Sequence, residues 1–227
     1  MRVSRTSFGA LPLQRTSRDE SVALLTRALE AGINFYDTAR AYSDSEEKLG
    51  CAFAGRRDVL IATKSAGRTR QEVLDHLAVS LKNLRREYVD ILQLHNPSSL
   101  PSPDDPESPC AGLLEARQRG LTRYIGISSH RLADAVRAAE SGLYDTIQFP
   151  LSALSDGKDL SLIDVCRKHN IGLIAMKPLC GGLLTHIPAA FAFLRQFTTV
   201  IPIWGIQHQR ELQQILALED DPPPLDD

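Results

Sequence analysis

The stretch INFYDTARAYSDSE, residues 33–46, joins an apolar run to a polar loop. The run INFYD ends on Asp37, and Tyr42 follows in a loop of small and polar side chains. Short apolar runs without polar alternation are typical of strands that are buried on both faces of a parallel sheet. The stretch therefore predicts a buried strand whose carboxyl end presents a carboxylate and a phenol.

Six further runs share this near-continuous content of Val, Ile and Leu, and a weaker candidate precedes them all. The six are VLIATK (59–64), VDILQLH (89–95), RYIGIS (123–128), TIQFP (146–150), GLIAMKPL (172–179) and VIPIWG (200–205); the weaker candidate is TSFGA (6–10). Together with residues 33–37 they predict eight strands.

Amphipathic helical segments separate these runs. Ser17 with Glu20 reads as a capping box at the start of one helix, and Thr69 with Glu72 repeats the pattern at another. Strands that alternate with helices are typical of βα units, and eight units close a (β/α)₈ TIM barrel of parallel strands. The competing doubly wound sheet usually carries a Gly-rich phosphate loop, which is absent from this sequence. We therefore predict a barrel.

Composition limits the classes of partner. The chain has 227 residues, of which 26 are basic and 28 acidic, so the net charge is −2. The sequence has no concentration of basic residues that would indicate nucleic-acid binding. No apolar run approaches the roughly 20 residues that span a bilayer. The four cysteines are scattered without C-x-x-C or zinc spacing, as expected of reduced thiols in a cytoplasmic protein. We expect one barrel domain over residues 1–218 and a disordered acidic, Pro-rich tail, EDDPPPLDD, over 219–227.

Polar side chains occur where the predicted strands end. In a barrel these carboxyl ends share one mouth, where catalytic groups are assembled from several loops. The residues at these positions are Asp37, Lys64, His95, Ser128, Ser129, Gln148 and Lys177, with Tyr42 just beyond its strand.

Four of these residues form a chemically coherent set. A phenol is a weak acid with an ordinary pKa near 10, and a neighbouring ammonium group favours the phenolate. Lys64 would therefore ease proton donation by Tyr42, and Asp37 would hold the buried lysine charged. His95 would orient a carbonyl oxygen or relay the proton. Such a set can protonate the oxygen of a carbonyl group while another group supplies the reducing equivalent to its carbon. These two steps are the requirement for carbonyl reduction.

The sequence resembles the aldo-keto reductase family. The similar segments are GINFYDTARAYSDSEEKLG, VLIATK, DILQLHNP, RYIGISSH, TIQFP and AMKPLCGG, and the resemblance extends from about Phe8 to Leu216. It implies a monomeric barrel oxidoreductase that reduces a small aldehyde or ketone with NADPH, with NADH as the alternative cofactor. It also implies that Tyr42 is the general acid, assisted by Asp37, Lys64 and His95.

The resemblance further implies a set of cofactor contacts. Ser128 and Gln148 match positions that contact the nicotinamide carboxamide, and Arg210 is a candidate for a 2′-phosphate clamp. The full implied set is Ser128, Ser129, Gln148, Met176, Lys177, Pro178, Leu179, Gly205, Gln209 and Arg210.

Some features depart from the family pattern. Ser129 stands where Asn is usual, Met176 where many relatives have Tyr, and Ile203–Trp204 where Lys–Ser is usual. The N-terminal hairpin that plugs the barrel in many relatives is missing, and the iron–sulfur tail of some similar bacterial members is absent. The loop at 96–109 and the segment between 181 and 199 are also short for the family. These short loops imply an open substrate pocket, which leaves substrate selectivity undefined.

Two other functions are compatible with the sequence. One is a nicotinamide-binding sensor or partner subunit with little turnover, which the open pocket and Met176 would suit. The other is a metal-dependent hydrolase using Asp37, His95 and His130, although the sequence has no H-x-H ligand pair.

Overall fold

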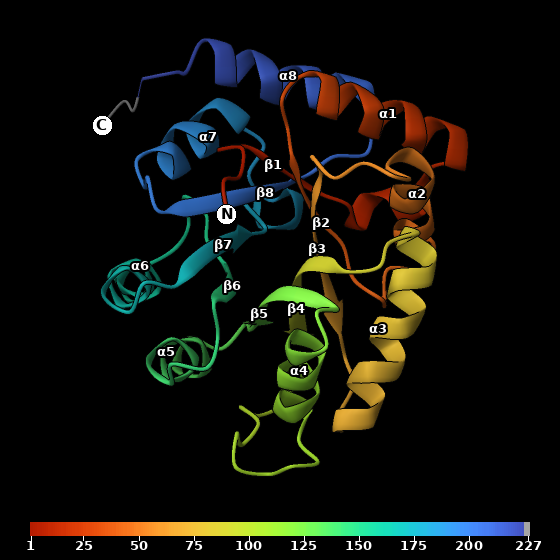
Figure 1. The fold of residues 1–227 in the computed structure, drawn as a ribbon. Helices are drawn as coiled ribbons and strands as arrows, with labels where there is room; N and C mark the ends of the chain where they lie inside the picture. The colour runs from red at the N-terminus through yellow and green to blue at the C-terminus, as the bar shows by residue number, and fades with distance from the viewer. Residues whose placement is uncertain (225–227) are drawn as a thin grey trace.

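The computed structural model describes residues 1–224, so residues 225–227 of the expected tail lie outside the described part. Eight parallel strands form a closed barrel in sequence order, which confirms the predicted (β/α)₈ architecture. The helices lie around the outside, and the ring closes where α1 (Arg18–Glu30) lies beside α8 (Gln209–Asp220) (Figure 1).

Every predicted strand is present. The bounds are β1 (Ser7–Gly9), β2 (Phe35–Asp37), β3 (Leu60–Ser65), β4 (Val89–His95), β5 (Thr122–Ser128), β6 (Thr146–Pro150), β7 (Gly172–Met176) and β8 (Val200–Gly205). Most boundaries agree to within one or two residues, and the largest difference is at β7, which ends at Met176 instead of Leu179. The backbone of Lys177 turns into the left-handed region at φ +56°, which an extended strand cannot contain.

The other helices follow the strands in turn. They are α2 (Ser45–Ala52), α3 (Arg70–Leu84), α4 (Pro109–Gln118), α5 (Leu132–Glu140), α6 (Gly157–Lys168) and α7 (Ile187–Arg195), with 3₁₀ turns η1 (Leu11–Arg15) and η2 (Cys180–Gly182). The capping box at Ser17 forms as predicted, since Ser17 and Glu20 satisfy each other's backbone N–H groups at the start of α1. None of the helices in residues 1–224 is long and apolar enough to cross a membrane.

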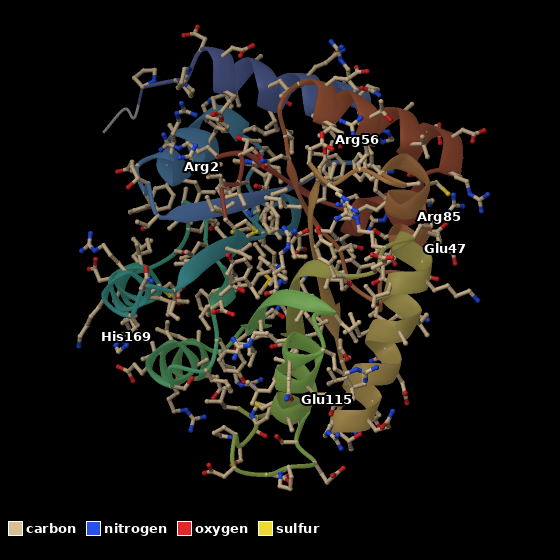
Figure 2. All side chains as sticks on the ribbon, in the orientation of Figure 1. Arg2, Glu47, Arg56, Arg85, Glu115 and His169 are labelled. Carbon is tan, nitrogen blue, oxygen red and sulfur yellow. The ribbon has the colours of Figure 1, made fainter. Side chains whose placement is uncertain are left out.

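The apolar core has two layers. A small cluster inside the barrel contains Phe35, Ala62, Ile91, Ile174 and Ile203, and a much larger cluster fills the space between barrel and helices. Because strand residues alternate, the inward-facing members of the small cluster share a face with residues two positions later, nearer the mouth. Polar side chains such as those of Glu47 on α2, Glu115 on α4 and His169 after α6 lie on the outer helical layer (Figure 2).

A cavity of about 430 Å³ opens at the end of the barrel where the strands begin. Its lining is mostly apolar and includes Val3, Phe35, Ile91 and Ile201. Residues 1–6 form no hairpin over it, although Ser4 donates its backbone N–H to Oδ1 of Asn34 at 2.6 Å. Of these apolar side chains, Val3 and Ile201 are half-buried, whereas Phe35 and Ile91 remain buried.

The C-terminal helix extends beyond the expected boundary of the barrel. Helix α8 continues to Asp220, so residues 219 and 220 are helical and not the start of a tail. Glu219 accepts a hydrogen bond from Oγ1 of Thr6 at 2.8 Å and pairs with Arg195 at 2.8 Å. These contacts fix the last turn of α8 against the N-terminal segment and α7.

The close contact between α2 and α3 requires a glycine. A Cβ atom on Gly50 would lie 2.1 Å from the carbonyl oxygen of Asn83 and 2.9 Å from the carbonyl carbon of Leu84. Both are backbone atoms, so the helices would have to separate.

We expect Gly50→Ala to lower the free energy of unfolding by about 1–3 kcal/mol, the usual cost of overpacking. The matched control is Gly157→Ala at the start of α6, where a Cβ atom meets nothing within 4 Å. That variant should stay within about 0.5 kcal/mol of the wild type. Urea unfolding of the three proteins measures both effects, and equal midpoints would show that α2 can move away from α3 at no cost.

Candidate active site

The structure brings the four predicted catalytic residues together. Nζ of Lys64 lies 2.6 Å from Oδ2 of Asp37 and 5.2 Å from the centroid of the Tyr42 ring. The rings of Tyr42 and His95 meet edge to face, with centroids 5.6 Å apart. Asp37 and His95 are the last residues of β2 and β4, and Lys64 lies near the end of β3, so all are at the mouth of the barrel.

Strand register explains why distant residues meet. In the parallel ladders His95 pairs with Ser128, and Ser128 pairs with Gln148. Asp37 pairs with Ala62, two residues before Lys64 on the same face of β3. The closed barrel therefore carries inward-facing polar groups of β2 to β6 to one rim.

The loop that carries Tyr42 is held by the backbone of neighbouring strands. The N–H groups of Thr38 and Arg40 donate to the carbonyl oxygens of Ala62 and Lys64, at 2.8 and 3.0 Å. At the other end of the loop, Oγ of Ser45 donates to the carbonyl oxygen of Ala10 at 3.0 Å. These bonds fix both ends of residues 38–45 and so determine where the phenol lies.

Asp37 and Lys64 form a buried ion pair, with at most 3% of either side chain exposed. Nζ of Lys64 also donates to the carbonyl oxygen of Thr38 at 2.7 Å. Burial lowers the pKa of Lys64 and raises the pKa of Asp37, while each partner's charge acts in the opposite direction. Oδ1 of Asp37 is buried and has no hydrogen-bond partner among the described residues.

The pKa of Tyr42 differs from the sequence-based expectation. Burial raises the pKa of the Tyr42 hydroxyl, and the charge of Asp37 raises it further. The predicted overall lowering of the pKa is wrong, because burial has the largest effect on the hydroxyl and acts in the opposite direction. Tyr42 is therefore fully protonated at neutral pH and carries the proton that a general acid must donate.

His95 is neutral at neutral pH. Burial lowers the pKa of His95 to about 4, and the charges of Lys64 and His130 add to the effect. A neutral imidazole has one N–H donor and one acceptor nitrogen. It can therefore donate a hydrogen bond to a carbonyl oxygen without bringing a second positive charge to the site.

The two serines of the predicted cofactor set have local hydrogen bonds. Oγ of Ser128, at the end of β5, accepts from the backbone N–H of Asn96 at 3.0 Å. Oγ of Ser129 accepts from the backbone N–H of Arg131 at 3.0 Å and donates to its carbonyl oxygen at 3.1 Å. Both hydroxyls thus stabilise the loops at the mouth.

The remaining predicted cofactor residues lie at the ends of β7 and β8 and on the segments that follow. Met176 ends β7, and Lys177, Pro178 and Leu179 lead into η2. Gly205 ends β8, while Gln209 and Arg210 begin α8 and are exposed. Trp204 is buried and stacks on Phe191, with centroids 5.7 Å apart, so it packs in the core.

Gln93 is a site residue that sequence reasoning missed. It is fully buried in β4, two residues before His95, and its Nε2 donates to Oε1 of Gln148 at 2.9 Å. The signal was its alternation with His95, which puts both on the inward face of the strand. No group of three His, Cys, Asp or Glu side chains that could hold a metal ion occurs within residues 1–224, so the hydrolase alternative gains no support.

These features define a parallel (β/α)₈ barrel whose mouth holds a protonated phenol, a buried ammonium–carboxylate pair and a neutral imidazole. Residues 6–190 match the model of the aldo/keto reductase family. The chain belongs to that family.

Individual relatives agree with this assignment. The chain is 28% identical to an uncharacterized oxidoreductase, YqkF, of Bacillus subtilis over 82% of this chain and 64% of the relative. It is 30% identical to the L-galactose dehydrogenase of Arabidopsis thaliana over 82% of this chain and 65% of the relative. It therefore spans just under two thirds of the length of these curated relatives.

Solved structures share the fold. The aldo-keto reductase AKR11C1 of Bacillus halodurans superposes with a TM-score of 0.87 at 22% identity, covering 100% of this chain and 89% of that one. A Bombyx mori aldo-keto reductase in complex with NADP gives a TM-score of 0.75 at 22% identity, covering 95% of this chain and 83% of that one.

The Asp37–Lys64 pair yields a stability prediction. Asp37→Leu leaves a buried ammonium without its partner, which typically costs about 3–5 kcal/mol. Removing both charges in Asp37→Leu/Lys64→Met should cost less than the sum of the two single changes, because no buried charge is then left without its partner. Denaturant unfolding of the four proteins measures the coupling; additive costs would mean that the pair does not act as a unit.

His95 yields a prediction for pH dependence. Its pKa is about 4 when folded and 6.5 ordinarily, so the unfolded state binds more protons between these values. The contribution of His95 to the stability of the folded state is fully present above pH 6.5 and is lost as the pH falls toward 4. The melting temperature of the wild type should therefore fall more steeply over this window than that of His95→Asn. Parallel curves for the two proteins would contradict the lowered pKa.

Proposed function

We propose that this chain reduces an aldehyde or ketone to an alcohol, with NADPH as the hydride donor. The observation that carries the proposal is the protonated Tyr42 beside the buried Lys64–Asp37 pair, with neutral His95 against its ring. Membership of the aldo/keto reductase family supports the same reaction class.

The residues of the mouth account for the proton half of the reaction. The cofactor, when bound, supplies a hydride to the carbonyl carbon. As the carbon–hydrogen bond forms, the carbonyl π electrons move to oxygen, and that oxygen takes the hydroxyl proton of Tyr42. His95 donates its N–H to the same oxygen and so holds the carbonyl in position.

Lys64 acts on the product of this proton transfer. The raised pKa of Tyr42 keeps the hydroxyl protonated until an alkoxide, a much stronger base than water, develops beside it. The phenolate that remains is stabilised by the ammonium group of Lys64, 5.2 Å from the ring centroid. Asp37 keeps Lys64 charged in a site where burial favours the neutral amine.

The side chains at the mouth also suit a dinucleotide. In this proposal Ser128, Ser129 and Gln148 receive the carboxamide of the nicotinamide, and Met176 packs against its ring. Residues 177–179 and Gly205 line the path toward the phosphates, and Gln209 and Arg210 meet the adenosine end.

The choice of NADPH over NADH rests on Arg210. Its guanidinium is exposed in the first turn of α8 and has no ion-pair partner among the described residues. A guanidinium group at a helix N-terminus favours a phosphate, which NADPH carries on its adenosine ribose and NADH does not. The Bombyx mori structure in complex with NADP is consistent with this choice.

The substrate class follows from the reaction and from relatives. A methylglyoxal reductase, DkgB, of Salmonella typhimurium is 32% identical over 74% of this chain and 65% of the relative, which suggests small carbonyl compounds as first substrates. We also propose that the protein acts as a monomer in the cytoplasm; its four cysteines are all free, as in a reducing compartment.

The test is Tyr42→Phe, assayed by NADPH oxidation with methylglyoxal and a panel of aldehydes and ketones. Turnover should fall by about 10²- to 10⁴-fold, the usual contribution of a general acid, while NADPH still binds. The matched control is Tyr88→Phe, because Tyr88 precedes β4 at the opposite end of the barrel and only accepts a hydrogen bond from Arg123.

Unchanged turnover in Tyr42→Phe would remove Tyr42 from the mechanism. The alternative function, a cofactor-binding sensor or partner subunit, is favoured by one observation: burial and the charge of Asp37 raise the pKa of Tyr42 overall. Tight NADPH binding by the wild type with no oxidation across the whole panel would select that function.

A further inference from the structure

Gln93 is a buried polar residue that the proposed proton transfer does not use. Its side chain is fully buried inside the barrel, and the parallel ladders place it level with Lys64 on one side and Gly126 on the other. Burying an amide is costly unless its polar atoms are paired. Oε1 of Gln93 has no partner in the described part of the chain. Packing alone therefore does not explain an amide at this position.

Within residues 1–224, the only side-chain hydrogen bond of Gln93 goes to Gln148. Nε2 of Gln93 donates to Oε1 of Gln148 at 2.9 Å, and Gln148 is itself 1% exposed. A glutamine amide has one acceptor oxygen and one NH₂ donor group. Because the bond from Gln93 turns the oxygen of Gln148 toward β4, the NH₂ group is the end that Gln148 presents to other partners.

Asp37 favours the same orientation of the Gln148 amide. A carboxylate only accepts hydrogen bonds, so an amide beside it is more stable with its NH₂ group toward the charge. Gln148 lies close enough to lower the pKa of Asp37, but the contact falls outside hydrogen-bond geometry, and Oδ1 of Asp37 stays unpartnered. Gln93 holds the oxygen of the Gln148 amide, and Asp37 attracts its NH₂ group. Both residues therefore favour the same orientation of this amide.

A glycine provides the space for this arrangement. A Cβ atom on Gly126 would lie 3.2 Å from Cγ of Gln93 and 2.2 Å from Oγ1 of Thr146. Any larger residue in β5 would push both side chains, so Gln93 reaches Gln148 across a strand that contributes no side chain at this level.

We propose that Gln93 is a positioning residue that fixes the polarity of Gln148, so that Gln148 presents its NH₂ group, and not its oxygen, to the nicotinamide carboxamide. The ligand in this inference rests on the proposed function. The chemical consequence is that Gln148 recognises the carbonyl oxygen of the carboxamide. Gln93 contacts neither the cofactor nor the substrate and acts only through Gln148.

Two substitutions at Gln93 separate polarity from packing. Gln93→Met keeps the length of the side chain but cannot donate, so the Gln148 amide loses its anchor. We expect NADPH to bind this variant on the order of 5- to 10-fold more weakly, the effect of about one net hydrogen bond. Isothermal titration calorimetry with NADPH measures the dissociation constant, and thermal unfolding verifies that the variant is folded.

Gln93→Glu should behave differently. Burial favours a protonated carboxyl group, whose O–H can donate to Oε1 of Gln148 just as the amide does. Binding should therefore be restored relative to Gln93→Met at acidic pH. It should weaken at any higher pH at which the carboxyl ionises, because a carboxylate accepts only. Wild-type affinity in Gln93→Met, or equal weakening in both variants at every pH, would overturn the assignment.

A measurement without cofactor keeps the inference independent of the proposed function. Hydrogen exchange of the side-chain amides, followed by ¹⁵N NMR in the free wild type, should be slower for Gln93, whose NH₂ group is hydrogen-bonded, than for Gln148. Slower exchange at Gln148 would mean that it donates to Gln93, and the inference would fail. If the wild type binds neither NADPH nor NADH, the proposed function fails instead, and the order of exchange still decides the polarity.

Discussion

The site depends on one interaction, the 2.6 Å contact between Lys64 and Asp37 inside the mouth of the barrel. Neither charge is tolerable there alone, because burial penalises both ionised forms. The pair is held by two neighbouring strands and by the carbonyl oxygen of Thr38 at the start of the Tyr42 loop. The position of the phenol is thus tied to the same lysine that, in the proposed reaction, stabilises its phenolate. The buried charges, the geometry of the Tyr42 loop and the proposed chemistry all depend on the contact between Lys64 and Asp37.

Much of the fold could be predicted because burial leaves a pattern in the sequence. Strands covered by helices must be apolar on both faces, so runs such as VLIATK and VDILQLH stand out. Capping residues such as Ser17 mark helix starts for an equally local reason. What local pattern does not contain is backbone geometry at a strand end. The left-handed turn at Lys177, which stops β7 before residues 177–179, arises from the connection to η2 and has no signature in an apolar run.

The candidate site was predictable in its members but not in its electrostatics. Position at strand ends was enough to select Asp37, Lys64 and His95, since parallel strands in a barrel end at one rim. The direction of the Tyr42 pKa shift depends on how deeply the ring is buried and on how close the charge of Asp37 lies. Both quantities need coordinates. Gln93 shows a related limit, because a single polar residue inside an apolar run reads as a minor irregularity until its partner across the barrel is seen.

The closed order of strands also divides the ring into two sectors. Asp37, Lys64 and His95 come from β2, β3 and β4, whereas most residues assigned here to the dinucleotide come from β5 to β8 and the segments after them. Consecutive strands are neighbours throughout, so each sector is a continuous piece of chain. Recombination between related barrels at the β4–β5 connection would therefore exchange one sector as a unit. The architecture would let the proposed acid chemistry and the proposed coenzyme preference be inherited separately, with the hydrogen bond between Gln93 and Gln148 crossing that boundary.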